Sequence, residues 1–175
     1  MRRNIFIIIT LTCLLSACAA GKGESARLFV DDQTPELQVT VQTAPPTPAD
    51  AVVLQALTLL GVGYRNAGKI PQTGFDCSGL VRYVYHEARG IDLPNTAAEL
   101  ARVGKNVERD ALRPGDLVFY NTLRRAYSHV GIYLGENRFI HAPRPGSEVR
   151  IEDMSSHYWV ARFDGARRIL AASSQ

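Results

Sequence analysis

Cysteine is scarce in this sequence: its 175 residues include three, which are Cys13, Cys18 and Cys77. So few cysteines, in an odd number, exclude a small fold held together by disulfides. Glycine and proline, at 14 and 9 residues, are too infrequent for a fibrous repeat. The excess of basic over acidic residues, 20 against 17, is too small to indicate binding of nucleic acid.

The hydrophobic residues, at 46% of the chain, exclude a disordered protein and suffice for one globular domain. One apolar run, residues 5–17, follows a positively charged start. It is shorter than the roughly 20 apolar residues that a membrane-spanning helix needs. A charged start followed by a short apolar run predicts a secretory signal.

The end of this apolar run, Leu15-Ser16-Ala17-Cys18, resembles the bacterial lipobox. The resemblance implies cleavage before Cys18 and attachment of lipid to that cysteine. Ala19 in the next position implies an anchor in the outer membrane, facing the periplasm. An uncleaved anchor helix and an ordinary signal peptide are the alternatives, and either would still export the protein.

Three segments follow from these patterns. We predict a lipoprotein signal peptide over residues 1–17, a lipid-anchored flexible linker over 18–48 and a folded domain over 49–172. The linker is rich in Gly, Ser, Gln and Thr and ends in a proline cluster, which is typical of an extended tether.

Helices are predicted in the first part of the domain and strands in the second. Thr47 begins a helix that ends at Gly61, Asp76 caps a second helix, and Thr96 begins a short third helix that ends at Gly104. Strands are predicted at 117–120, 129–134, 138–142, 148–151 and 166–170, the second and third of these forming a hairpin. This order favours an α+β fold whose N-terminal helices pack on an antiparallel sheet.

Cys77 is the candidate nucleophile, because it is the only free thiol once the signal is removed and Cys18 carries lipid. It lies in the first turn of the second predicted helix, where unpaired amides and the helix dipole stabilise a thiolate. The neighbouring Asp76 carboxylate opposes this effect. His129 and His141 have the same phase on the two strands of the hairpin, so we expect them on one face, nearly opposite each other.

These residue types fit acyl transfer by a thiol. One histidine could take the proton of Cys77 while the other orients the first imidazole. The remaining histidines fit less well. His86 lies on the far side of the predicted Cys77 helix, and His157 lies in an aromatic segment typical of packing or surface.

Four ordered motifs resemble the NlpC/P60 family of peptidoglycan endopeptidases, and in particular its outer-membrane lipoproteins. The resemblance spans roughly residues 50–170. The motifs are Phe75-Asp76-Cys77-Ser78-Gly79-Leu80-Val81, Leu112-Arg113-Pro114-Gly115-Asp116-Leu117-Val118-Phe119, Ser128-His129-Val130-Gly131-Ile132-Tyr133 and Phe139-Ile140-His141-Ala142.

This resemblance implies a papain-like cysteine peptidase domain over residues 49–172. Its substrate would be peptidoglycan, cut at an amide bond of a stem peptide or cross-link, either γ-D-glutamyl–diaminopimelate or D-alanyl–diaminopimelate. It implies Cys77 as nucleophile, His129 as general base and His141 as the orienting third residue. No cofactor, metal or nucleic acid is implied, and the membrane is a partner through the lipid on Cys18.

The resemblance also implies the outline of a substrate cleft. Tyr64 would line it near the reacting carbonyl, and Asp76 and Ser78 would border the amine side of the substrate. The backbone amide of Cys77 would donate to the oxyanion.

Two places depart from the family pattern. Asn66 and Ala67 stand where an aromatic residue and a glycine are common, and Asn95 stands where arginine is common. These departures put the substrate subsite in doubt but not the reaction class.

Other interpretations stay open at this point. The chain could be a non-catalytic scaffold that binds peptidoglycan, or an acyltransferase or amidase on the same fold. Cys77, His129 and His141 could also ligate zinc, although the sequence has neither an HExxH motif nor paired cysteines with zinc-ligand spacing.

Overall fold

The computed structural model describes residues 47–170. The predicted signal peptide, the lipidation site Cys18, nearly all of the predicted linker and residues 171–172 lie outside this range. Within it, no helix is both long enough and apolar enough to cross a membrane.

Two N-terminal helices begin where their capping residues predict. Helix α1, Pro48–Leu57, has a capping box between Thr47 and Asp50. It ends before the predicted stop at Gly61, because the last residues before that glycine form hydrogen-bonded turns. Helix α2, Cys77–Arg89, is capped by Asp76 and ends at Gly90 in the left-handed conformation.

Two shorter helices follow. Helix α3, Ala97–Leu100, has the predicted capping box at Thr96 but ends before the predicted limit at Gly104. Helix α4, His157–Val160, and a 3₁₀ turn at Arg109–Ala111 did not follow from the sequence pattern.

The strands form one six-stranded antiparallel sheet in the order β3-β8-β4-β5-β6-β7. The sequence pattern predicted five of these six strands approximately and did not predict β3. A separate small hairpin, β1 with β2, precedes α2. The bounds are β1 Lys69–Ile70, β2 Gly74–Phe75, β3 Lys105–Val107, β4 Leu117–Tyr120, β5 His129–Gly135, β6 Arg138–His141, β7 Arg150–Asp153 and β8 Phe163–Arg168.

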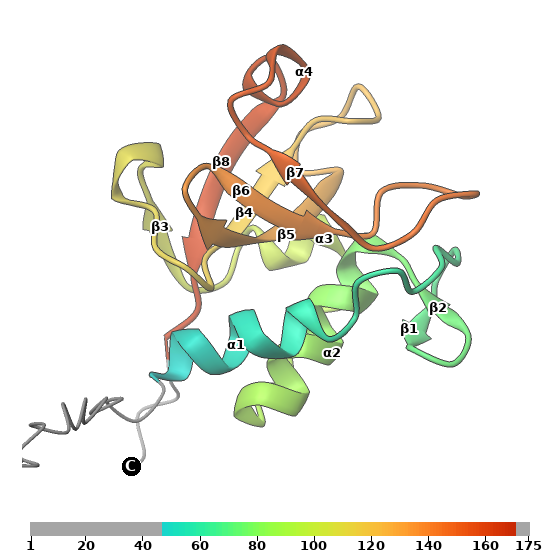
Figure 1. The fold of residues 1–175 in the computed structure, drawn as a ribbon. Coiled ribbons are helices and arrows are strands. Elements are labelled where there is room, and N and C mark those ends of the chain that lie inside the picture. Colours follow the sequence, from blue (N-terminus) through green and yellow to red (C-terminus); the bar gives the residue numbers. More distant parts are fainter. Residues whose placement is uncertain (1–46, 171–175) are drawn as a thin grey trace, which may run out of the picture. The chain divides into compact units, whose positions relative to one another are not determined.

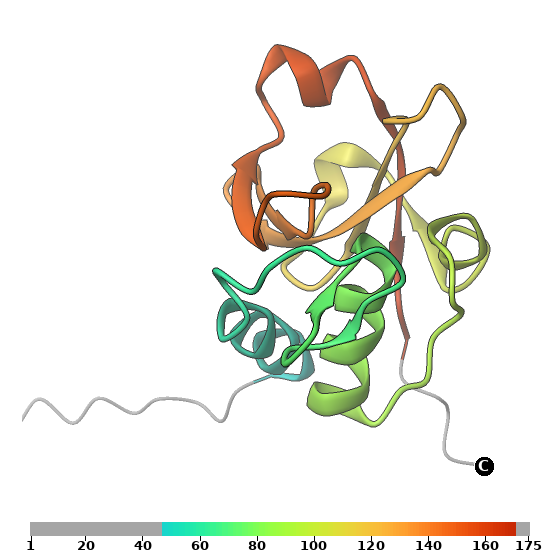
Figure 2. The same cartoon turned by 90° about the vertical axis from the view of Figure 1, so that its right-hand side faces the viewer.

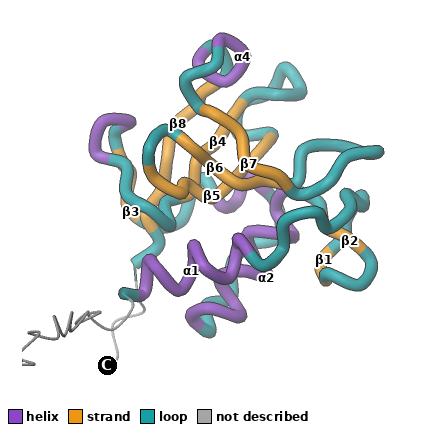
Figure 3. Tube along the Cα trace, viewed as in Figure 1, coloured by secondary structure: helices purple, strands orange, loops and turns teal. Residues whose placement is uncertain are grey.

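Helices α1 and α2 cover one face of the sheet, as Figures 1 and 2 show from two directions. Figure 3 shows the same view with helices, strands and loops in separate colours. The predicted α+β architecture, with N-terminal helices packed on an antiparallel sheet, is confirmed.

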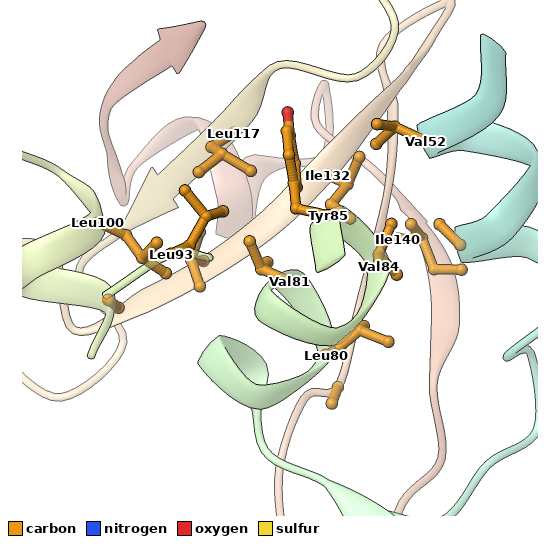
Figure 4. Packing of buried hydrophobic residues seen from close by; sticks show 14 of the residues in the cluster. Val52, Leu80, Val81, Val84, Tyr85, Leu93, Leu100, Leu117, Ile132 and Ile140 are labelled. Atoms are coloured by element: carbon orange, nitrogen blue, oxygen red, sulfur yellow. The ribbon is translucent and has the colours of Figure 1, made fainter. Parts of the chain in front are cut away.

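The sheet has an apolar layer on each face, because successive strand residues point to opposite sides. The helix-covered face holds Val130, Ile132 and Ile140 together with side chains from α1 and α2. Figure 4 shows this packing around Val84. The other face holds a smaller apolar cluster, whose members include Val118, Tyr120, Tyr133, Phe139, Met154 and Trp159.

Asp116 directly precedes β4 and has a structural role. It is buried, and its carboxylate accepts hydrogen bonds from Arg168 Nε at 2.8 Å and Nη2 at 2.7 Å. It also accepts one from the Arg113 backbone amide at 2.8 Å. This pair ties the start of β4 to the end of β8.

Replacing Asp116 with alanine should therefore lower the free energy of unfolding by about 1–3 kcal/mol, because the Arg168 guanidinium and the Arg113 amide lose their acceptor. Urea unfolding followed by circular dichroism would measure the loss. Asp110→Ala, at an exposed position, is the matched control. Equal stability of the Asp116→Ala and Asp110→Ala variants would contradict this role.

Candidate active site

Cys77 is the first residue of α2, as predicted. The Asp76 carboxylate caps the helix by accepting from the Gly79 amide at 2.7 Å and from the Ser78 hydroxyl at 3.0 Å. The backbone amide of Val130, the second residue of β5, is near enough to the Cys77 sulfur to lower the pKa of the thiol. Cys77 is thus held beside the start of the strand that carries His129.

Gly79 lets the preceding loop approach the nucleophile. A Cβ atom at this position would lie 1.9 Å from the Gly68 carbonyl oxygen, so no other residue fits without a shift of the backbone. The same carbonyl accepts a hydrogen bond from the Asp76 amide at 3.2 Å. This close contact holds the loop that contains Tyr64 against the N-terminus of α2.

Burial dominates the acidity of the Cys77 thiol. It raises the pKa to about 11, and the Asp76 carboxylate adds to the increase. Backbone amides of Val130, Ser78 and Cys77 lower the pKa, which is the direction predicted for the helix N-terminus. Because burial outweighs these amides, the resting group is a thiol, and the effect expected from the helix N-terminus only partly offsets the rise in pKa.

His129 and His141 are brought together as predicted. His129 Nε2 and His141 Nδ1 are 2.7 Å apart, the two rings are nearly perpendicular, and both side chains are buried. Their positions differ from the prediction in one respect. Ile132 pairs with Ile140, so by this register His141 is diagonal to His129 and not directly opposite it.

Burial keeps both imidazoles neutral. It lowers the pKa of His129 to about 3, His141 adds to the decrease, and Glu152 opposes it. Burial also lowers the pKa of His141. A neutral imidazole beside a neutral thiol can accept the proton as the sulfur attacks.

Glu152 and Trp159 complete this cluster. The sequence pattern did not identify either of them as a site residue. Glu152 Oε1 lies 3.5 Å from His141 Nε2, and Oε2 accepts the Trp159 indole N–H at 2.5 Å. The indole also stacks on His129, at 6.0 Å between ring centres. Residues 148–151 were predicted as a strand. One more residue of alternation would have placed Glu152 on the face of His141.

A cleft of about 680 Å³ adjoins Cys77. Tyr64, Asp76, Cys77 and Ser78 all line it, so the structure gathers the predicted substrate residues around the thiol. The three departures from the family pattern line it as well. Other lining residues were not predicted; they include Lys69, Arg82, Thr96, Arg125 and Tyr127.

The remaining candidates lie apart from this site. His86 is exposed and contacts Asp92 at 3.0 Å, and His157 is an exposed residue at the start of α4. Among residues 47–170, no group of three or more His, Cys, Asp or Glu side chains has the arrangement of a metal site.

Comparisons with known proteins agree on one family. A model described as the NlpC/P60 family matches residues 61–168. The chain is 45% identical over 158 residues to "Murein DD-endopeptidase MepH" of Escherichia coli, covering 89% of this chain and 55% of the relative. It is 44% identical to "Gamma-DL-glutamyl hydrolase" of Bacillus subtilis, covering 71% of this chain and 30% of the relative.

Solved structures give the same result. A NlpC/P60 family protein from Bacillus cereus superimposes with a TM-score of 0.66 at 32% identity, covering 72% of this chain and 41% of its own. The NlpC/p60 domain of the peptidoglycan hydrolase SagA superimposes with a TM-score of 0.60 at 35% identity, covering 69% of this chain and 98% of that domain. The chain spans about half or less of the curated relatives described above.

The raised pKa of Cys77 predicts the pH dependence of its alkylation. The group is protonated below its pKa, so the rate with iodoacetamide should keep rising from about pH 8.5, the usual thiol value, towards about 11. Mass spectrometry of the Cys77 peptide measures the rate without interference from other cysteines. Circular dichroism would define the highest pH at which the fold persists. A rate that already levels off at neutral pH would indicate a preformed thiolate and contradict this prediction.

Proposed function

The chain belongs to the NlpC/P60 family, and from that premise we propose that it is a cysteine peptidase that hydrolyses amide bonds in peptidoglycan stem peptides or cross-links. The observation that carries the proposal is the meeting of three groups. The Val130 amide, next in the chain to His129, is near enough to lower the pKa of the Cys77 thiol, and His129 Nε2 is 2.7 Å from His141 Nδ1. A thiol and two linked imidazoles are the parts that acyl transfer to sulfur requires.

The reaction begins at the resting thiol. Cys77 Sγ attacks the scissile carbonyl carbon while His129 accepts the thiol proton, and the Cys77 backbone amide donates to the oxyanion. The intermediate collapses, the C–N bond breaks, and His129 returns the proton to the leaving amine. A thioester then links the acyl portion to Cys77.

Water completes the cycle. His129 takes a proton from the water as its oxygen attacks the thioester carbonyl, and the proton returns to the departing sulfur. A free carboxylic acid and the original thiol result. Each proton that His129 accepts it later gives up, so no cofactor enters the balance.

The cleft residues supply substrate recognition in this proposal. Tyr64 is partly buried and lines the cleft together with Cys77. In this proposal it packs near the reacting carbonyl of the substrate. The Asp76 carboxylate and the Ser78 hydroxyl, linked at 3.0 Å, border the amine side of the substrate. Asn66 and Asn95 line the same cleft. They therefore influence which bond is cut more than they influence the acyl-transfer step itself.

The bond that is cut is one of two. The names of the relatives point to both classes, since one is a DD-endopeptidase of murein and another is a γ-DL-glutamyl hydrolase at nearly equal identity. Both D-alanyl–diaminopimelate and γ-D-glutamyl–diaminopimelate bonds therefore belong to the proposal. Product analysis distinguishes them.

The proposal is tested on intact sacculi. Wild-type protein should release shortened stem peptides or opened cross-links, identified by mass spectrometry of the muropeptides. Cys77→Ala should release none above the blank, and His129→Ala should lose at least about a hundredfold in rate, the usual contribution of a general base.

The matched control for this experiment is His86→Ala, an exposed histidine on the same helix as Cys77. It should leave the rate unchanged. Products that are the same for wild type and Cys77→Ala would overturn the proposed activity. Binding of sacculi by both proteins, with no turnover by either, would support a scaffold instead.

We also propose export and lipid anchoring. The supports are the charged start, the apolar run 5–17 and the lipobox-like end at Cys18. In a bacterium with two membranes, the lipid would hold the domain at the outer membrane, facing peptidoglycan from the periplasm.

Cys18→Ser should therefore move the protein from the membrane fraction to the soluble periplasmic fraction. Radiolabelled palmitate should label wild type and not the variant. Cys13→Ser is the matched control and should keep both the label and the membrane association. Membrane association without palmitate, unchanged by Cys18→Ser, would indicate an uncleaved anchor helix and contradict lipidation.

A further inference from the structure

One charged group touches the catalytic cluster without a role in the proposed reaction. Glu152 lies on β7, the edge strand beyond the two histidine strands. In the β6–β7 register His141 is opposite Arg150, so Glu152 is its diagonal neighbour on the same face. Glu152 does not line the cleft around Cys77.

The environment of Glu152 keeps it a carboxylate. Arg150 Nε donates to Oε1 at 2.7 Å, and the Trp159 indole N–H donates to Oε2 at 2.5 Å. The nearby His141 imidazole, followed by the Trp159 and Arg150 donors, lowers the pKa of Glu152 to about 2 against the opposing effect of burial. An ionised carboxylate only accepts hydrogen bonds.

The Nε2 atom of His141 faces this carboxylate. The histidine is fully buried, and its Nε2 has no hydrogen-bond partner among the described residues; Glu152 Oε1 lies 3.5 Å from it. A lone pair on Nε2 would face a negative oxygen, whereas an N–H would be attracted by it. The proton of neutral His141 is therefore placed on Nε2.

This placement determines the state of the second histidine. A neutral imidazole protonated on Nε2 presents an acceptor at Nδ1. His141 Nδ1 is the atom 2.7 Å from His129 Nε2, so His129 must donate there. His129 is then unprotonated at Nδ1, which is the one nitrogen left to accept the proton of Cys77.

We propose that Glu152 is a positioning residue that fixes the tautomers of His141 and His129, so that the free base of His129 is Nδ1. The inference rests on the proposed function, because it names the residue that prepares the general base of that reaction. Glu152 acts through His141 and does not touch the substrate. Its negative charge also favours the imidazolium that forms when His129 takes a proton.

Nitrogen-15 NMR of the imidazoles in the full-length protein, with Glu152 unchanged, tests the proton placement directly. With His129→Gln and His141→Gln used for assignment, both rings should show protonated Nε2 and unprotonated Nδ1 near neutral pH. A spectrum with His141 protonated on Nδ1 would overturn the proposal. This readout does not require turnover, so it stands apart from the test of peptidase activity.

Kinetics of Glu152→Gln provide the second measurement. The amide cannot accept from Arg150, Trp159 and His141 together, so the histidine tautomers should become mixed. The value of kcat should fall at least about tenfold, with an upper limit near the 10⁴-fold loss known for a wrongly protonated triad histidine. KM should stay unchanged, because the cleft is not altered.

The matched control is Glu136→Gln, an exposed glutamate in the turn between β5 and β6 that pairs with Arg138. It should keep wild-type kcat and wild-type imidazole spectra. Thermal unfolding of each variant shows whether it is folded. A folded Glu152→Gln protein with unchanged kcat and unchanged tautomers would contradict the positioning role.

Discussion

The hydrogen bond between His129 and His141 is the interaction on which the site depends. It joins neighbouring strands, so it exists only if β5 and β6 keep one register. A slip by one residue would turn either histidine into the opposite face of the sheet. The apolar residues that alternate with the histidines prevent this slip, because they fill the core beneath the helices. Gly131 supports the same register, since a Cβ there would lie 2.6 Å from the Phe139 ring.

Cys77 and the two histidines belong to different layers of the fold. Helix α2 packs on one face of the sheet, and the histidine rings lie on the other. The two meet at the start of β5, where the Val130 amide is near enough to the Cys77 thiol to lower its pKa. The site is therefore built at a strand end and not within a layer. Both layers must be folded before a thiol and a base can meet.

Burial decides the charge state of this meeting point. Water exclusion favours the neutral forms of Cys77 and His129, and the helix amides do not reverse that preference. The carboxylate of Glu152 lies on β7, the edge strand next to β6, and keeps its charge because His141, Trp159 and Arg150 lower its pKa. A negative charge therefore lies next to His141, where it can stabilise the imidazolium that forms when His129 accepts a proton.

Much of the site could be predicted from the sequence, because local signals were strong. Asp76 before an amphipathic stretch defined the start of α2, and the phase of His129 and His141 in apolar alternation placed them on one face. The α+β class followed from the order of helices and strands. Strand β3 and helix α4 are too short for a periodic signal. The roles of Glu152 and Trp159 depend on a tertiary contact that local pattern does not encode, and the acidity of Cys77 depends on burial.

The most direct test of the central claim is detection of the acyl-enzyme. Wild-type protein would be mixed with a purified cross-linked muropeptide, quenched in acid within the first turnovers and digested for mass spectrometry. The peptide that contains Cys77 should carry the acyl portion of the substrate as a thioester, with the amine portion free in solution. Cleavage of the muropeptide with no adduct on Cys77 at any quench time, or with an adduct on another residue, would contradict a thiol mechanism at this site.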